Sequence, residues 1–346
     1  MDQNPLITVI IVAYKRTNYI LDAIKSVIDQ TIDKDTFELI VIKNFSNNVI
    51  DKYIHLHGIK NILSSDTTLL GKILEGTMIA SGKFISILED DDFFKPNKLY
   101  EIKKEYELNS KLVYVHNNYE LIDLNGNLIH KKNNNYKSKL IKSTDISNQI
   151  NFCFNFGYHN NSCITIKKSI LLDNYEFLKM YKTNNWVDLS FLILSLYSIQ
   201  IAGKNGTLFI TNNILTQYRV HKSLSAFIPN DSNEFIHNGI KIKNDDIILI
   251  KNLPDYVDVI ITQSLRCYIS SFLSIEMLLF TILDPIDFNV GKLKRIKLAV
   301  SVLLSKYKVL SKRSKRIIFI VFLSTIIGEK LLRGILMKLL DNGKSI

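Results

Sequence analysis

Cysteine is scarce in this sequence, and the common phosphate-binding loops are missing. Only Cys153, Cys163 and Cys267 occur among 346 residues, without the paired short spacing of a zinc site or the density of a disulfide scaffold. They are most simply core thiols in a reducing compartment. Neither G-x-G-x-x-G nor G-x-x-x-x-G-K-[ST] follows an expected strand, which argues against a dinucleotide-dependent oxidoreductase and against a P-loop enzyme.

We expect neither a targeting segment nor a membrane-spanning segment in this sequence. The start, MDQNPLITVIIVAY, has no basic n-region and no small-residue cleavage site, so we expect no secretion. The apolar run at 317–328 would span roughly 18 Å as a helix, well short of the hydrocarbon thickness of a bilayer. We therefore predict a cytoplasmic protein without a transmembrane helix.

Positive charge is concentrated in the tail. Residues 291–346 hold 14 Lys and Arg against two acidic residues, a net of +12, whereas the preceding 290 residues hold 30 basic and 31 acidic residues, a net of −1. We therefore predict no nucleic-acid partner. Helically spaced apolar residues beside the lysines of the tail indicate an amphipathic helix at an anionic leaflet. The alternative is a helical subdomain packed on the rest of the chain or on a second subunit.

Short apolar runs alternate with helical patterns over the first hundred residues. Apolar, β-branched runs predict strands, and apolar residues with a period of 3.6 predict helices. This alternation is typical of an α/β fold with a mostly parallel, helix-covered sheet, which binds ligands outside the carboxyl ends of its strands. The expected strands are 7–13, 37–42, 60–63, 83–88, 112–117, 163–167 and 208–214; the expected helices are 19–30, 69–80, 96–108 and 187–197; a hairpin is expected at 119–128, a mobile loop at 130–142, and mainly helices from about 245.

Four consecutive carboxylates, Glu89 to Asp92, follow the apolar run in KFISILEDDDFFK. They would stand where a buried strand leaves the core, close enough to repel one another, so a positive partner is expected there. Taken alone, an acidic triplet is more often a solvated turn. The rest of the chain has to decide between these two interpretations.

Four separated stretches of the chain carry one pattern. They are ITVIIVAYKR, SGKFISILEDDDFF, NNWVDLSFLILSL and LTQYRVHKSLS. In this order they resemble the signature of glycosyltransferase family 2 on a GT-A fold, over about the first 225 residues. The resemblance implies an inverting transfer of a sugar from a nucleoside diphosphate sugar to a hydroxyl. It divides the chain into a nucleotide-sugar-binding half (1–115), an acceptor-binding half (116–230) and a mainly helical, basic C-terminal extension (231–346).

The acid cluster takes the place of the metal motif of this family. Mg²⁺ or Mn²⁺ prefers carboxylate oxygens and would neutralise charge on the diphosphate. The resemblance implies metal ligation by Asp91 and Asp92. Glu89 stands where the family usually has an aspartate turned towards the ribose, a departure that lengthens the reach by one methylene.

Asp188 takes the place of the general base of the family. An inverting transfer needs a group that accepts the proton of the attacking hydroxyl. The alternative is an ordinary helix N-terminal acid, favoured by the helix dipole. Trp186 could stack on a sugar ring, and a lone tryptophan is equally at home in a core.

The stretch QYRVH matches the closing Tyr-Arg-x-His element of the family. By resemblance, Tyr218, Arg219 and His221 would contact the diphosphate, the metal or the acceptor. The alternative makes them a buried pair and a cap.

The nucleotide end departs further from the family. The second strand ends in Lys43-Asn44 where an aspartate usually reads the base, and Lys72 stands near the place of a missing arginine. Asn44 can still bind a pyrimidine edge through donor and acceptor groups. The nucleotide-sugar-binding set implied by the resemblance is Ala13, Tyr14, Arg16, Asn44, Lys72, Glu89 and Asp90.

The resemblance and the tail together suggest the setting. A membrane-bound tail would hold the site against the inner face of the cell membrane, where the acceptor would be a glycan or a lipid-linked glycan. The main alternative is a protein of the same fold that has lost activity and serves as a binding or scaffold subunit. The replaced aspartate and arginine favour that alternative, while Asp91, Asp188 and the Tyr-Arg-x-His element argue against it.

Overall fold

The computed structural model describes residues 4–130, 136–181, 187–200 and 206–220, with a few single positions between 319 and 331. The chain divides into two compact units, and all the elements below belong to the first, which includes Met1–Val220. The helical extension predicted for 231–346 lies outside the described residues, apart from those single positions.

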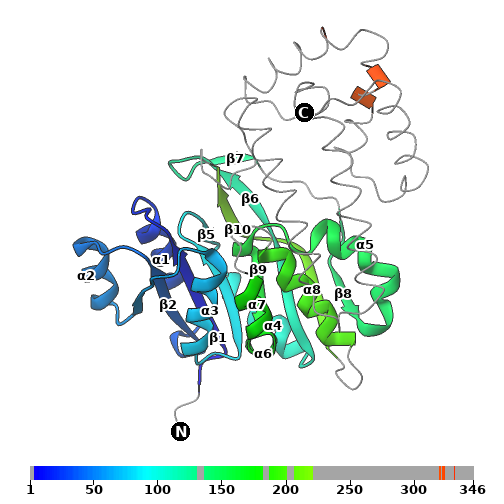
Figure 1. Ribbon diagram of the computed structural model, residues 1–346, viewed down its shortest axis with the longest axis horizontal. Helices are drawn as coiled ribbons and strands as arrows, with labels where there is room; N and C mark the ends of the chain where they lie inside the picture. The colour runs from blue at the N-terminus through cyan, green and yellow to red at the C-terminus, as the bar shows by residue number, and fades with distance from the viewer. Residues whose placement is uncertain are drawn as a thin grey trace. The chain divides into compact units, whose positions relative to one another are not determined.

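Four parallel strands form the first half of the sheet, in the order β3-β2-β1-β4 (Figure 1). They alternate with helices, as the sequence predicts for a chain that returns to the same edge after each strand. Ile7 of β1 pairs with Phe37 of β2 on one side and Phe84 of β4 on the other, so the three strands run in register. The bounds are β1 (Ile7–Ala13), α1 (Ile20–Ile28), β2 (Phe37–Lys43), α2 (Asn48–Leu56), β3 (Lys60–Leu63), α3 (Leu69–Ile79) and β4 (Phe84–Glu89).

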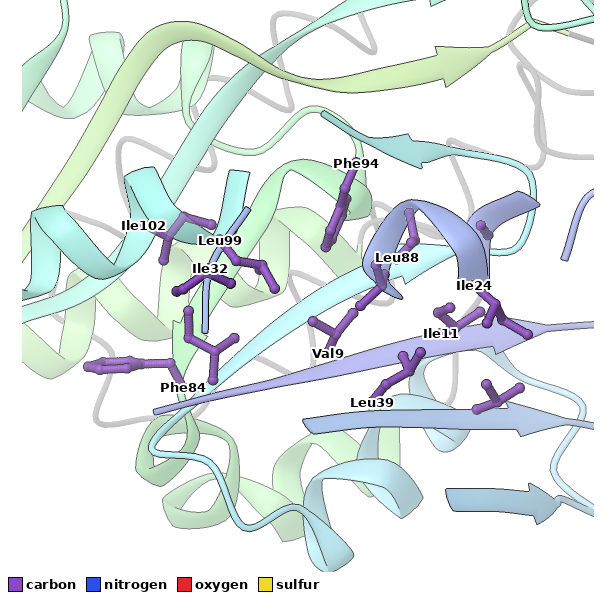
Figure 2. Packing of buried hydrophobic residues seen from close by; sticks show 14 of the residues in the cluster. Val9, Ile11, Ile24, Ile32, Leu39, Phe84, Leu88, Phe94, Leu99 and Ile102 are labelled. Atoms are coloured by element: carbon purple, nitrogen blue, oxygen red, sulfur yellow. The ribbon is translucent and has the colours of Figure 1, made fainter. Parts of the chain in front are cut away.

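The core explains why these segments form strands and helices. Every residue of β1 is buried, as expected for a central parallel strand covered on both faces. Side chains of one sheet face pack under α1 and the later helix α4 (Lys98–Leu108). Figure 2 shows this layer, which includes Val9, Ile11, Ile24, Leu39, Leu88, Leu99 and Ile102.

The second half of the sheet is mixed. The antiparallel β9 (Ile164–Lys167) lies between β4 and β6 (Leu112–Ile122), and β6 pairs in parallel with the long β10 (Thr207–Arg219). The strand β5 (Phe93–Phe94) pairs with the end of β10. The remaining elements are β7 (Leu128–His130), β8 (Lys139–Lys142), α5 (Ile146–Phe156), the short 3-10 helix η3 (Asn161–Cys163), α6 (Lys168–Asp173), α7 (Tyr175–Tyr181) and α8 (Val187–Gln200).

The α/β class with a mostly parallel, helix-flanked sheet is confirmed, and most expected elements are present. The sequence interpretation missed α2, α5, α6, α7 and β5, and it ended the last strand at 214 although β10 continues to Arg219. The loop predicted at 130–142 is wrong at its end, where β8 pairs with Thr207–Ile210. That pairing joins distant segments, so the polar local sequence gives no sign of it. Residues 131–135 of the predicted loop lie outside the described residues.

Candidate active site

The carboxyl ends of β1, β2 and β4 meet at one edge of the sheet. Ala13, the last residue of β1, pairs with Lys43, and Val12 pairs with Glu89. The residues that follow these strands, Tyr14 and Asn44 among them, therefore leave the sheet beside the acid cluster. This is the edge at which parallel sheets bind ligands.

The acid cluster, Glu89–Asp92, is buried rather than a solvated turn. Asp90, Asp91 and Asp92 are 3%, 6% and 1% exposed. Burial, together with the charge of Asp91, raises the pKa of Glu89 and the pKa of Asp92. Burial also raises the pKa of Asp90 against the opposing effect of its arginine partner. The surroundings of the cluster thus disfavour the charged forms of these carboxylates.

Arg16 closes onto this cluster from the loop after β1. Its guanidinium lies 2.5 Å from Asp90 Oδ1 and 2.8 Å from Asp91 Oδ2. The sequence predicts Arg16 beside a nucleotide, and in this structure it contacts the acids. The positive partner expected for the acid cluster is therefore present within the protein.

Asp92 ties three segments together. Its Oδ1 accepts a hydrogen bond from the backbone N–H of Arg219 at 3.0 Å, and its Oδ2 accepts one from Asn160 Nδ2 at 3.2 Å. Both carboxylate oxygens are thus engaged by protein donors. This arrangement favours Asp91 over Asp92 as the group that could hold a cation.

Arg219 is 2% exposed and binds backbone rather than facing a ligand. Its Nε donates to the carbonyl of Asp91, and its NH1 donates to the carbonyls of Asp123 and Leu124. The guanidinium also lies over the rings of Tyr19 and Phe93. In this structure Arg219 follows the alternative of a buried structural group, which closes the far side of the acid cluster. The neighbouring Tyr218 packs edge-on against Tyr119.

Asp188 stands in the first turn of α8. Burial of the carboxyl raises its pKa to about 7, although the backbone N–H groups of Leu189 and Asn160 stabilise the charged form. A carboxylate with a pKa near neutrality can take up and release a proton under ordinary conditions. The position and the pKa both suit the base that the sequence suggested.

Sequence reasoning missed Asn160, Asn161 and Ser162, which join these groups. Asn161 Nδ2 donates to Glu89 Oε1 at 2.8 Å, and Ser162 Oγ accepts from the backbone N–H of Glu89 at 3.0 Å. Asn161 Oδ1 is a buried acceptor for which the described residues supply no donor. No motif or periodicity in the sequence around 160–162 marks this role.

The nucleotide end shows which candidates could face a ligand. Tyr14 is 43% exposed, and the ammonium groups of Lys15 and Lys72 lie 5.3 and 5.0 Å from its ring centroid. Asn44 Oδ1 accepts a hydrogen bond from the backbone N–H of Lys15 at 2.9 Å. Lys72 itself is 1% exposed, and burial lowers its pKa.

Lys43 takes no part in an open site. Its Nζ forms an ion pair with Asp51 of α2 at 2.7 Å and donates to the carbonyl of Phe45. It is 1% exposed. The residue that replaces the usual base-reading aspartate is therefore a structural tie between β2 and α2.

Two of the predicted site residues are not described by the structure. Trp186 and His221 lie outside the described residues. Within the described ranges, no group of three or more His, Cys, Asp or Glu side chains is arranged to hold a metal ion. In the same ranges, no helix has the length and apolar character needed to cross a membrane.

Comparison with known proteins assigns part of the chain to a family. Residues 8–166 match the model of the Glycosyl transferase family 2. These residues form a family 2 glycosyltransferase domain. The family predicted from the four sequence stretches is thereby confirmed, and the matched segment of this domain contains β1, the acid cluster and Asn160–Ser162.

Curated relatives of this glycosyltransferase domain are similar over part of their length. An uncharacterised glycosyltransferase of Rickettsia prowazekii is 34% identical over 129 residues, which cover 36% of this chain and 40% of that protein. One of Methanocaldococcus jannaschii is 31% identical over 146 residues, covering 40% of this chain and 50% of that protein. One of Rickettsia bellii is 30% identical over 138 residues, covering 36% of this chain and only 19% of that protein. The chain thus spans half or less of the length of these relatives.

Solved structures support the fold of the glycosyltransferase domain. The crystal structure of S. aureus TarS aligns with a TM-score of 0.52 at 12% identity, covering 95% of this chain and 55% of that chain. TarS residues 1–349 in complex with UDP-GlcNAc align with a TM-score of 0.51 at 10% identity, covering 98% of this chain and 92% of that chain. At such low identity the likeness establishes the GT-A fold alone.

Proposed function

We propose that this chain is an inverting, metal-dependent glycosyltransferase that moves a sugar from a nucleoside diphosphate sugar to a hydroxyl acceptor. One observation carries the proposal. A buried, mutually repelling acid cluster and a second carboxylate with a pKa of about 7 are joined through a single short segment at the ligand-binding edge of the sheet.

In this proposal Asp188 accepts the proton of the acceptor hydroxyl as that hydroxyl attacks the sugar. General bases work best when their pKa lies near the working pH, which burial achieves for this carboxylate. The N–H groups of Leu189 and Asn160 hold the carboxylate in place and oppose the cost of its burial. The released diphosphate leaves on the side of the acid cluster.

The acid cluster fits a divalent cation by its chemistry. Its carboxylate oxygens are the ligands that Mg²⁺ and Mn²⁺ prefer. Burial raises the pKa of Glu89 and of Asp92, and a bound cation would stabilise their charged forms. Asp91 would hold the ion together with diphosphate oxygens. Arg16 would have to leave Asp91 at least in part. A bound cation would supply charge neutralisation at the diphosphate.

The nucleotide would lie over Tyr14, between Asn44 and Lys72. Tyr14 is the exposed aromatic side chain at this edge, and Lys72 supplies positive charge below it. The crystal structures of TarS with UDP and with UDP-GlcNAc make uridine diphosphate sugars the first donors to test. The base and the sugar are otherwise open.

The acceptor is proposed to be a glycan or a lipid-linked glycan at the inner face of the cell membrane. The support is the net charge of +12 in residues 291–346, which would bind an anionic leaflet. Sedimentation with anionic liposomes, comparing the full chain with one ended near residue 287, tests this part. Equal pelleting of both chains would leave the tail as a packing or oligomerisation segment.

A donor screen tests the central proposal. Thermal shifts of the full chain are measured with UDP-GlcNAc, UDP-glucose, UDP-galactose, GDP-mannose and dTDP-rhamnose, each with Mn²⁺, with Mg²⁺ and with EDTA. We expect one donor to raise the melting temperature in the presence of metal, and to be hydrolysed slowly without acceptor. Binding without hydrolysis or transfer would instead support a non-catalytic binding subunit.

A further inference from the structure

The acid cluster and Asp188 lie far apart in the sequence, yet one tripeptide contacts both. Asn160–Ser162 runs from the N-cap of η3 into η3 itself. Through β9, which follows directly, it is built into the sheet between β4 and β6. It is therefore fixed to the same strand that carries the acid cluster.

On the cluster side, each of the three residues binds a carboxylate or its backbone. Asn160 Nδ2 donates to Asp92 Oδ2 at 3.2 Å, and Asn161 Nδ2 donates to Glu89 Oε1 at 2.8 Å. Ser162 Oγ accepts from the backbone N–H of Glu89 at 3.0 Å and also binds the Asp92 carboxylate. Hydrogen bonds to buried carboxylates orient them as well as stabilising their charge.

On the other side, the backbone N–H of Asn160 donates to the Asp188 carboxylate. Asn160 holds this orientation with a φ of 73° and a ψ of 118°, and its Oδ1 accepts from the backbone N–H of Ser162 at 2.8 Å. Only one other non-glycine residue in the described ranges, Lys15, has a positive φ, and it too lies at the site. Such strained backbone persists only where the surroundings hold it, and it is concentrated at functional sites.

Two buried side chains hold the backbone of this segment. The carbonyl of Ser162 accepts hydrogen bonds from Lys98 Nζ at 2.5 Å and from Thr216 Oγ1 at 3.0 Å. Lys98 comes from α4 and Thr216 from β10, and both are fully buried. The segment is therefore held by α4 and β10 on this side and by the acid cluster on the other.

We infer that Asn160–Ser162 is a positioning segment that holds the acid cluster and Asp188 in one geometry for transfer. The inference rests on the proposed function, which used only the backbone N–H of Asn160, and it adds roles for the side chains of Asn160, Asn161 and Ser162. In the part of the chain that the structure describes, Tyr14, Asn44 and Lys72 on the nucleotide side bond to other groups than this segment. Loss of the segment's hydrogen bonds should thus affect turnover far more than nucleotide binding.

Two variants test the inference. Asn160→Gly keeps the positive φ and the N–H to Asp188 but removes the amide bonds to Asp92 and Ser162. Ser162→Ala removes the Oγ contacts with little change in volume and no backbone strain, so it serves if the first variant folds poorly. The control is Asn174→Ala, since Asn174 is a buried amide whose Nδ2 donates to the carbonyl of Ile170 in α6 and not to the acid cluster.

Two quantities are measured for each full-length variant. One is the dissociation constant for UDP with Mn²⁺ by calorimetry, and the other is the rate of UDP-GlcNAc hydrolysis at saturating donor. If the wild type responds to another donor of the screen, that donor and its diphosphate replace them. We expect Asn160→Gly and Ser162→Ala to lower the rate about 10- to 100-fold, the usual scale for residues that orient a reacting group, with the dissociation constant within about threefold.

The outcomes separate this inference from the proposed function. If the wild type is active and both variants lose no more rate than Asn174→Ala, the segment is only a loop, while the proposed function stands. Equal losses in affinity and in rate would also overturn the positioning role, because they indicate general damage to the site. If the wild type itself binds and turns over no donor, the proposed function fails first.

Discussion

The two sides of the candidate site differ in how their polar and charged groups are stabilised. The acid side is made of Glu89–Asp92, Asn160–Ser162 and Asp188. Its carboxylates are buried or half-buried, and the pKa values of Glu89, Asp92 and Asp188 are raised. On the lysine side, made of Lys15, Lys43 and Asn44 after β1 and β2, polar groups are satisfied within the protein. Both sides stand at carboxyl ends of neighbouring parallel strands.

This difference distinguishes charged groups with perturbed pKa values from charged groups that only hold the fold together. Lys43 has a partner of opposite sign 2.7 Å away, and the attraction between the two charges offsets part of the desolvation cost of burying the ammonium group. Asp90 and Asp91 both contact Arg16, while Asp92 and Glu89 accept hydrogen bonds from the neutral amides of Asn160 and Asn161. Carboxylates with raised pKa values are common at sites that act on ligands, whereas an ion pair such as that of Lys43 is typical of a structural contact.

Removal of Asp188 should have the largest effect on activity. We expect Asp188→Asn to lower turnover by about a hundredfold or more while nucleotide affinity changes little, since the loss of a general base acts on the chemical step. In the wild type, turnover should fall as the pH drops below about 7, because burial raises the pKa of this carboxylate to that value. Turnover of Asp188→Asn equal to the wild type would remove Asp188 from the mechanism.

The same substitution should stabilise the fold at high pH. The pKa of Asp188 is raised in the folded protein, from 3.8 to about 7, so its stabilising contribution is present below pH 4 and is lost as the pH rises through about 7. The amide of Asp188→Asn would imitate the neutral form at every pH, so the variant should gain stability at pH 8, at most about 4 kcal/mol, and show little gain at pH 4. Urea denaturation at the two pH values measures this. A variant that is less stable than the wild type at pH 8 contradicts the assignment of that pKa.

Replacement of Asp91 should have the next largest effect, on metal-dependent nucleotide binding. We expect Asp91→Ala to weaken UDP binding in Mn²⁺ about tenfold or more and to leave binding in EDTA nearly unchanged, as for a lost metal ligand. Calorimetric titrations in the two buffers give the comparison, with Asp123→Ala, an exposed turn residue, as the control. Metal-dependent binding that persists in Asp91→Ala would place the cation elsewhere or leave the acid cluster as a structural turn.

On the lysine side the loss should appear in stability and not in activity. Lys43→Met removes the buried partner of Asp51, whose side chain is about one-third exposed, so we expect a loss of about 1–2 kcal/mol in the free energy of unfolding. Turnover per folded molecule should stay within about twofold, since Lys43 faces no ligand. A large fall in nucleotide affinity would show that Lys43 leaves Asp51 when the donor binds.

Asn44 should give the smallest effect. Asn44→Ala removes the acceptor for the Lys15 N–H and the amide proposed to read the base, each a single neutral hydrogen bond. We expect UDP affinity to fall about three- to tenfold and the preference for uridine over other bases to weaken. Equal loss for every nucleotide would indicate that Asn44 only holds the loop at Lys15.

Local patterns were sufficient for the first half of the fold. A continuous buried strand such as β1 and an amphipathic helix such as α1 each follow from their own few residues. The same holds for the place of Glu89–Asp92 after β4, and for Asp188 in the first turn of α8. Where local preference and the global fold agree, the sequence is readable.

The mixed half was less readable because its pairings join distant segments. The strand β8 forms only by pairing with β10, and β9 is inserted antiparallel between β4 and β6. Arg219 belongs to a motif that suggested diphosphate contact, yet long-range contacts draw it to the backbone of Asp91, Asp123 and Leu124. No periodicity in a single chain records such contacts.

The sequence by itself determined which chemistry is available, because four acids after an apolar strand and an acid opening a helix are local facts. The tertiary structure decided what that chemistry can do. Burial raises the pKa of Asp188, and Arg16 places positive charge beside Asp90 and Asp91. Asn160 binds both the acid cluster, through Asp92, and Asp188. The reason is physical: a carboxylate takes its pKa and its orientation from the groups around it, and those groups come from distant parts of the chain.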